Sequence, residues 1–249
     1  MVSDRVGCGD SSGSPASGKH PLLRAVKPGA AAAGLTGGPA PRLIRRMPDC
    51  FTGGFVQTNG YLLQTPDGSP VVIDAPLGMA AWLTKRGIRP AALLLTHQHY
   101  DHVEDAAAVA ALGATVHAWS PYSTGLTLEE LMRSFGMPVE VAPFTVDVLL
   151  AGKSELVIGG LRLELAHVPG HAVDSVTFHS PATGELYSGD TLFAGSIGRA
   201  DLPGGDPELL IEGIRGKLFA LPDATVVYPG HGPATRIGAE RAGNPYCGD

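Results

Sequence analysis

The sequence has little cysteine, no long basic stretch and no long apolar run, and each scarcity excludes a class of protein. Three cysteines occur in 249 residues, at Cys8, Cys50 and Cys247, an odd and widely spaced set that supplies neither a disulfide framework nor a cysteine-based zinc site. The formal net charge of −6 argues against a general nucleic-acid surface. Because the chain shows neither a membrane-span-length apolar run nor a secretory leader, we expect a cytoplasmic protein that binds neither membranes nor nucleic acid.

The first part of the chain differs in composition from the rest. Residues 11–18 resemble a linker, and residues 29–39 consist mainly of Gly and Ala with little to bury. Such composition is typical of disordered segments. We therefore expect residues 1–41 to be disordered and residues 42–249 to form one folded domain, which is long enough to bury a full core.

The most informative segment is the pattern H-x-H-x-D-H formed by His97, His99, Asp101 and His102. His97 and His99 are two residues apart and project to the same side of an extended or looping backbone, whereas the adjacent Asp101 and His102 diverge. One short loop can thus serve two metal ions, and a metal ion turns bound water into hydroxide at neutral pH. A single His is more often a satisfied polar residue, but a chance match to this whole pattern is on the order of one in a thousand.

The pattern lies between a predicted strand and a predicted helix. Residues 91–96 form a short apolar run that indicates a buried strand, and residues 103–112 are Ala-rich with Glu104 and Asp105 in the first turn, as expected of a helix. Open α/β sheets place their chemistry at the carboxyl ends of strands. The position therefore favours a functional site over an ordinary loop.

The rest of the chain predicts a layered α+β fold. Further strands are expected at residues 54–56, 60–63, 70–74, 114–119, 155–158, 161–166, 175–179, 185–188 and 225–228, and helices at 79–86, 126–135, 206–219 and 237–242. Strands dominate each half, and helices lie between them. We therefore predict an αββα sandwich of two mixed β-sheets flanked by helices.

Three later segments share one arrangement, in which a short apolar strand is followed by Gly and then by His or Asp. These segments supply His171, Asp190 and His231. Glycine permits the tight turn that aims the next side chain over the strand end. Each segment alone is weak evidence, but together with the H-x-H-x-D-H pattern they supply enough ligands for two metal sites that share a carboxylate. The other histidines, His20, His117, His167 and His179, lack ligand spacing.

In this order, Asp74, the 97–102 pattern, His171, Asp190 and His231 resemble the five motifs of the metallo-β-lactamase fold superfamily, over about residues 50 to 245. The resemblance implies that residues 42–249 are a hydrolase domain of that fold. It implies two divalent ions, one held by His97, His99 and His171 and the other by Asp101, His102 and His231, with Asp190 bridging them. Asp74 would orient a ligand by a hydrogen bond, although an ordinary strand-end turn remains the alternative. Zinc is the expected metal, and the oxygen-rich second site also suits iron or manganese.

The segments 189–206, 227–233 and 240–246 are similar to the short glyoxalase II-like (hydroxyacylglutathione hydrolase-like) branch of that superfamily. There are departures: Val103, Glu104 and Asp105 follow His102 where small residues are common, and Asp174 stands where Gly is usual. We expect no counterpart here to the helical C-terminal region of long glyoxalase II enzymes, which helps to bind glutathione. Arg199 is the best remaining cation for binding a substrate carboxylate, with a structural salt bridge to Asp201 or Asp206 as the alternative.

The resemblance implies an enzyme that hydrolyses a small-molecule thioester or related acyl compound through a hydroxide that bridges the metals. Asp101 would orient the hydroxide or accept its proton. One alternative is a persulfide dioxygenase-like oxidoreductase with one iron held mainly by His97, His171 and Asp190; another is a lactonase or phosphodiesterase. The sequence does not predict the exact substrate or the oligomeric state.

Overall fold

A computed structural model describes residues 48–248, so the predicted disorder of residues 1–41 lies outside the described residues. The first sheet has the strand order β1-β2-β3-β4-β5-β6, and it is antiparallel from β1 to β3 and parallel from β3 to β6. Its strands are β1 (Asp49–Gly53), β2 (Thr58–Gln64), β3 (Pro70–Ile73), β4 (Ala92–Leu94), β5 (Thr115–Ala118) and β6 (Val148–Leu149).

The second sheet has the order β14-β13-β10-β9-β8-β7, in which β10 and β13 are parallel and the other neighbours are antiparallel. Its strands are β7 (Glu155–Ile158), β8 (Leu161–His167), β9 (Val176–Ser180), β10 (Glu185–Gly189), β13 (Val226–Pro229) and β14 (Thr235–Arg236). A small separate hairpin pairs β11 (Leu192–Phe193) with β12 (Ser196–Ile197). Both large sheets are mixed, as predicted.

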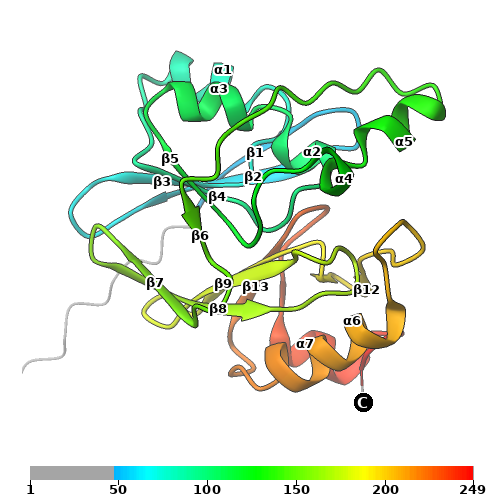
Figure 1. The fold of residues 1–249 in the computed structure, drawn as a ribbon. Coiled ribbons are helices and arrows are strands. Elements are labelled where there is room, and N and C mark those ends of the chain that lie inside the picture. The colour runs from blue at the N-terminus through cyan, green and yellow to red at the C-terminus, as the bar shows by residue number, and fades with distance from the viewer. Residues whose placement is uncertain (1–47, 249) are drawn as a thin grey trace, which may run out of the picture. The chain divides into compact units, whose positions relative to one another are not determined.

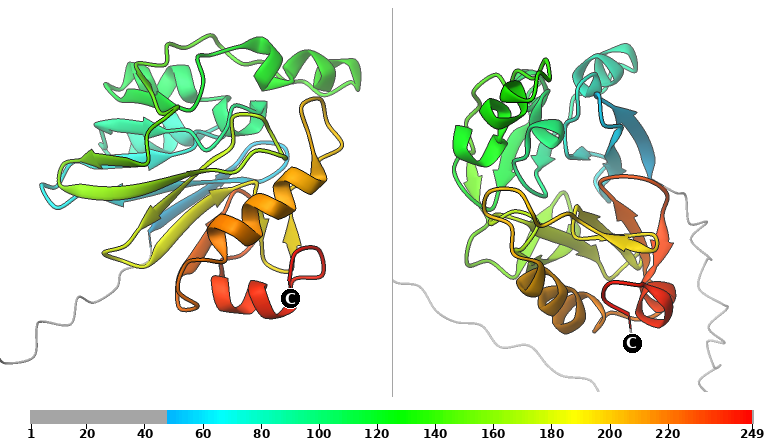
Figure 2. Two further views of the ribbon diagram at one scale, coloured as in Figure 1. Left: turned by 60° about the horizontal axis from the view of Figure 1, so that its bottom comes forward. Right: turned by 90° about the vertical axis from the view of Figure 1, so that its right-hand side faces the viewer.

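Helices cover the outer side of each sheet (Figures 1 and 2). The described helices are α1 (Met79–Lys85), α2 (Tyr100–Val103), α3 (Ala106–Ala111), α4 (Thr124–Thr127), α5 (Glu129–Ser134), α6 (Pro207–Gly213) with a π-helical turn (Ile214–Leu218), and α7 (Ile237–Gly243). In the part of the chain that is described, no helix is both long and apolar enough to cross a membrane. The arrangement is the predicted αββα sandwich.

Alternation of side chains along the strands builds the core in layers. In β3, Val72 packs in the cluster that contains α1 and α3, whereas its neighbours Val71 and Ile73 pack in the cluster between the two sheets. Phe178 and Tyr187 of the second sheet belong to the same central cluster and are almost fully buried. A third cluster joins the outer face of the second sheet to α6 and α7. The two-residue period of a strand thus assigns each side chain to one layer.

Residues 54–56 do not form the predicted strand. They lie in the turn between β1 and β2, where Gly54 and Gln57 have φ values of 70° and 59°. Positive φ reverses the chain, so the strand ends at Gly53, and Phe55 and Val56 are exposed. The aromatic and β-branched pair there favours a strand by composition, but the turn prevails.

Two predicted helices are interrupted. The helix expected at residues 103–112 becomes α2 and α3, which meet at Glu104 and Asp105. The helix expected at residues 126–135 becomes α4 and α5, because Leu128 between them has the left-handed angles φ 56° and ψ 15°. Helical periodicity continues through both breaks, which is why the sequence pattern alone predicts single helices.

Asp105 stabilises the start of α1. Its Oδ2 accepts hydrogen bonds of 2.9 Å from the backbone N–H groups of Gly78 and Ala80. Gly78 is the residue before the helix and has no side chain to cap it. An acceptor supplied from 27 residues away therefore satisfies donors that a helix leaves free at its N-terminus.

We expect Asp105→Ala to lower the free energy of unfolding by about 1 kcal/mol, the usual cost of a lost N-terminal cap. Asp105→Asn keeps an acceptor oxygen and serves as the matched control, with stability close to that of the wild type. Urea unfolding of the three proteins measures the difference. Equal midpoints for Asp105→Ala and the wild type would show that water satisfies these donors equally well.

Candidate metal centre

The predicted ligands lie in loops that follow the carboxyl ends of strands in both sheets. His97 and His99 follow β4, and Asp101 and His102 occupy the first turn of α2. The remaining ligands follow three strands of the second sheet, with His171 after β8, Asp190 after β10 and His231 after β13. The facing edges of the two sheets thus contribute to one site.

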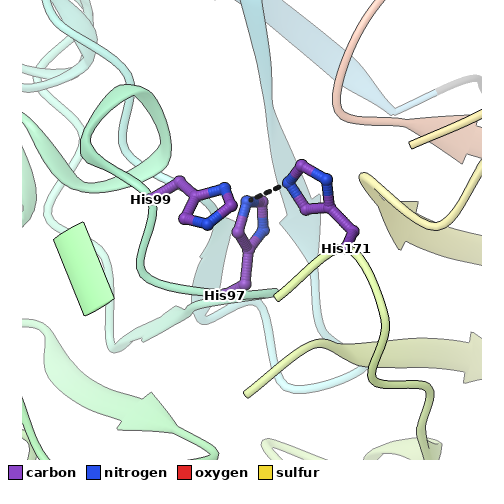
Figure 3. Close-up of side chains that lie close together, drawn as sticks. All are labelled: His97, His99 and His171. Carbon is purple, nitrogen blue, oxygen red and sulfur yellow. Dashed lines mark hydrogen bonds between the residues drawn. The ribbon is translucent and has the colours of Figure 1, made fainter. Parts of the chain in front are cut away.

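The structure brings these side chains into three overlapping groups, each able to hold a metal ion. The first is His97, His99 and His171, whose imidazoles converge in Figure 3. His97 Nε2 and His171 Nε2 are 3.2 Å apart. The groups are His97–His99–His171, Asp101–His102–His231 and His97–His102–Asp190, with ligand atoms of each within 4.8 Å of one another.

Asp190 lies between the first two groups. Its Oδ1 is 3.3 Å from His102 Nε2, and its Oδ2 is 3.5 Å from His171 Nε2 and 3.4 Å from His231 Nε2. Asp101 Oδ2 lies 3.2 Å from the same His231 nitrogen. A single carboxylate in this position contacts imidazoles of both groups, and its bridging of two ions stays a prediction.

Asp74 supports two of the predicted ligands through hydrogen bonds. Its Oδ1 accepts a hydrogen bond of 2.8 Å from the Thr96 N–H, and its Oδ2 accepts one of 2.8 Å from the Thr96 hydroxyl. The same Oδ2 is 2.8 Å from His102 Nδ1, and the Thr96 hydroxyl is 3.2 Å from His97 Nδ1. Asp74 is therefore more than an ordinary turn residue: it fixes one imidazole directly and a second through Thr96.

The unpaired atoms of the site fit a metal ion. His102 Nε2 and Asp190 Oδ1 are buried and have no hydrogen-bond partner among residues 48–248. Buried polar groups normally have hydrogen-bond partners. A metal-binding His typically donates a hydrogen bond from its other ring nitrogen to a carboxylate. His102 has this arrangement, because its Nδ1 meets Asp74 and its Nε2 faces the group.

Two imidazoles of the first group, those of His97 and His99, favour the neutral form. Burial, followed by the neighbouring imidazoles, lowers the pKa of His97 well below its ordinary value. Burial and then His171 lower the pKa of His99 to about 3. The neutral imidazole is the form that binds a metal.

In the second group, carboxylates and imidazoles shift one another's pKa values. Burial opposes ionisation of Asp101, but the charge of His102 and a hydrogen bond from His231 lower its pKa to about 2. For His231, burial opposes the charged form, whereas Asp101 and Asp190 raise the pKa to about 10. This group is arranged to hold positive charge.

Gly230, which precedes His231, is required by close packing. A Cβ there would collide with Asp190 Oδ1 and lie 2.6 Å from His102 Cε1. Gly170 and Gly189, which precede His171 and Asp190, have positive φ values of 131° and 51°, as the tight-turn argument predicts. Two of the three glycines thus serve the turn, and the third leaves room for the ligands.

Strand β2 joins the two sheets at the site. Thr58 Oγ1 donates a hydrogen bond of 2.6 Å to Asp101 Oδ2, and the Asn59 N–H donates one of 2.7 Å to the Gly230 carbonyl. The Tyr61 hydroxyl donates to the Pro229 carbonyl at 2.6 Å. Sequence reasoning misses Thr58 and Asn59, because no local pattern reveals partners so far along the chain.

A pocket of about 310 Å³ opens onto the ligands. Arg199 lines it, and its backbone carbonyl lies 2.7 Å from His171 Nδ1. The Arg199 guanidinium pairs with Asp201 at 2.8 and 2.7 Å, so the salt bridge considered as the alternative is present. Both side chains are exposed, and such pairs are weak; a role for Arg199 in binding substrate stays a prediction.

Three other histidines lie outside the ligand groups. His167 stacks on Trp119 with ring centroids 4.1 Å apart, His179 pairs with Glu164 at 3.0 Å, and His117 is buried in β5. His20 lies outside the described residues. Their positions agree with structural roles.

Comparison with known proteins defines the family. The model of the Metallo-beta-lactamase superfamily matches residues 53–231. The chain is 34% identical over 212 residues to the probable metallo-hydrolase YqgX of Bacillus subtilis, covering 81% of this chain and 96% of YqgX. It is 34% identical over 199 residues to the hydroxyacylglutathione hydrolase GloC of Haemophilus influenzae, covering 76% of this chain and 92% of GloC.

Among solved structures, that of TTHA1623 in a di-iron-bound form is similar, with a TM-score of 0.68 and 37% identity over 81% of this chain and 100% of that chain. The chain belongs to the metallo-beta-lactamase superfamily, and within it to the metallo-hydrolases. The fold implies binding of divalent metal, and the His and Asp groups described above are able to provide it. Both the fold class and the resemblance seen in the sequence are confirmed.

Asp174 is a buried carboxyl close to His171 in the chain, and burying it costs free energy. Its side chain is 1% exposed, and neither carboxylate oxygen has a well-formed hydrogen bond within residues 48–248. The nearby Gln98 Oε1 is also buried and unpartnered. Burial raises the pKa of Asp174 from 3.8 to about 6, so ionisation of this carboxyl opposes folding.

Because the pKa of Asp174 is raised in the folded protein, we expect the stability of the fold to depend on pH. The protonated Asp174 is compatible with the fold below pH 3.8, and the associated stability is lost as the pH rises through about 6. Asp174→Asn removes the titration and offers an N–H to Gln98, so we expect it to stabilise the protein at pH 7 by up to about 3 kcal/mol. Chemical unfolding at pH 4 and pH 7 tests this; a stabilisation that is equal at both pH values would contradict it.

For Asp74, Asp74→Asn is the informative substitution. Asp74 has φ 57°, and Asn tolerates this conformation, so the variant removes the negative charge and an acceptor without straining the backbone. We expect metal affinity to fall about 10- to 100-fold, the usual effect of losing such a partner. Competition with a chromogenic chelator measures it. Unchanged affinity would show that Asp74 serves only the backbone of the 97–102 loop.

Proposed function

We propose that the protein is a metal-dependent hydrolase of thioesters that works with two ions. In this proposal, His97, His99 and His171 hold one ion, and Asp101, His102 and His231 hold the other, with Asp190 between them. The observation that carries it is the position of Asp190, whose two oxygens contact imidazoles of both groups.

The reaction adds water to the thioester carbonyl carbon and breaks the C–S bond, giving a carboxylate, a thiol and a proton. When bound, divalent ions supply hydroxide at neutral pH and polarise the carbonyl. Asp101 would orient the attacking water and accept its proton, a role supported by the position of its Oδ2 beside His231 and by the hydrogen bond that it accepts from the Thr58 hydroxyl. Thr58 positions Asp101 by donating a hydrogen bond to its Oδ2.

Thioesters suit the residues that line the pocket. A thiolate departs without a strong general acid, and the pocket offers few groups for that role beyond the predicted ligands. The similarity to the hydroxyacylglutathione hydrolase GloC supports this class of substrate. The similarity to a di-iron form of TTHA1623 supports two ions and makes iron a candidate beside zinc and manganese.

The first test is metal content and thioester hydrolysis on one sample of the full chain purified without added metal. We expect two metals per chain and turnover of S-lactoylglutathione or of a simpler thioester. One iron per chain, no thioester turnover and oxygen uptake with glutathione persulfide would replace the proposal with a dioxygenase. Two metals without thioester turnover would retain a metallo-hydrolase and discard thioesters in favour of lactones or phosphodiesters.

Asp190→Ala is the matched variant. Because Asp190 contacts both groups, its loss is expected to weaken both ions together and to lower kcat/KM at least 100-fold. Metal analysis after dialysis and initial rates at saturating added metal measure the two effects. Full metal content with full turnover in the variant would contradict the assignment, and loss of one ion alone would exclude bridging.

A further inference from the structure

The wall of the pocket is largely apolar. Beside the predicted ligands and Arg199, its lining consists of Val56, Tyr100, Leu128, Met132, Phe193 and Leu202. Tyr100 carries the single neutral polar side-chain group among these lining residues. A substrate group beside the ions would therefore meet hydrocarbon, with few partners for a hydroxyl group.

Leu128 is the unusual member of this wall. It has φ 56° and ψ 15° and links α4 to α5. Within residues 48–248, the non-glycine residues with positive φ are Gln57, Asp74 and Leu128. Asp74 holds the ligands, and Gln57 follows Val56 of the pocket wall. All three strained positions are thus at or next to the site.

A branched leucine in this conformation costs free energy that Gly or Asn would avoid. Leu128 is nevertheless 8% exposed and in the pocket wall. The α5 backbone begins there, with the Met132 N–H bonded to the Leu128 carbonyl at 3.0 Å. Residues four apart share a helix face, so the break at Leu128 directs both side chains into the pocket.

The one arginine in the lining is already paired. The Arg199 guanidinium makes two hydrogen bonds with the Asp201 carboxylate. For Arg199 to bind an anionic acyl group, this pair would have to break, whereas contact with an apolar group leaves it intact. The charge distribution therefore also favours an apolar acyl group.

We propose that Leu128, supported by Met132, selects thioesters with a short apolar acyl chain over hydroxyacyl thioesters of the same thiol. This inference rests on the proposed thioester hydrolysis and adds the substrate class. Leu128 is the specificity-determining residue, and its strained backbone is retained because the side chain must face the pocket. Discrimination of one hydrophobic group in such a pocket is typically about 10- to 200-fold.

The experiment compares the butanoyl and lactoyl thioesters of N-acetylcysteamine, so that the thiol is constant. The full-length, metal-loaded wild type should show a kcat/KM at least 10-fold higher for the butanoyl thioester. Leu128→Asn keeps the left-handed backbone and replaces hydrocarbon with an amide, so the ratio should fall at least 10-fold. Leu128→Met retains an apolar side chain and should keep the preference.

Phe135→Asn is the matched control. Phe135 follows α5, is 69% exposed and does not line the pocket, so this variant should keep the wild-type ratio. Affinity for the S-butyl thioether of N-acetylcysteamine, measured by calorimetry, gives a readout without turnover. It should fall in Leu128→Asn but not in Leu128→Met or Phe135→Asn. If Leu128→Asn fails to fold, Met132→Gln tests the same wall.

The outcomes separate the two proposals. A wild-type kcat/KM for the lactoyl thioester that equals or exceeds the one for the butanoyl thioester overturns the selection by Leu128. This result leaves the proposed hydrolysis standing. An unchanged ratio in Leu128→Asn does the same. A metal-loaded wild type that hydrolyses neither thioester overturns the proposed function and this inference with it.

Discussion

The carboxylate of Asp74 is the interaction on which the site depends most. It is 2% exposed, sits at the end of β3, and contacts both Thr96 and His102. Thr96 lies at the end of the apolar segment that carries His97, so one buried anion fixes the entry and the exit of the 97–102 loop. The left-handed backbone of Asp74 turns the carboxylate toward this loop. A hydrogen-bonded network of this kind sets ligand positions through the fold itself.

Both sheets contribute predicted ligands to the site. The first supplies the 97–102 loop, whereas His171, Asp190 and His231 come from the second. The central apolar cluster brings the sheets together, and β2 secures their edge through Asn59, Tyr61 and the β-bridge between Thr58 and His231. A buried group of imidazoles and carboxylates is costly to assemble. Packing of the sheets and the mutual pairing of opposite charges offset that cost.

The sequence predicts the layered fold and the clustering of the ligands because both depend on local signals. Short apolar runs mark the strands, and Gly before His or Asp marks the turns that end them. The contributions of Thr58 and Asp105 could not be predicted, because their partners lie 43 and 27 residues away. The interruption at Leu128 also escaped prediction: its helical periodicity is intact, and only the folded surroundings impose the left-handed backbone.

Several unfavourable features of the molecule lie around the pocket. Leu128 and Asp74 have strained backbones, and Asp174 is a buried carboxyl without a well-formed partner in the described part of the chain. Elsewhere, the same described residues form three closely packed clusters in which strand alternation and helix faces agree. Natural sequences violate local preferences mainly where function requires it. The strain at Asp74 orients ligands and the strain at Leu128 presents a side chain to the pocket, so geometry at the site prevails over local stability.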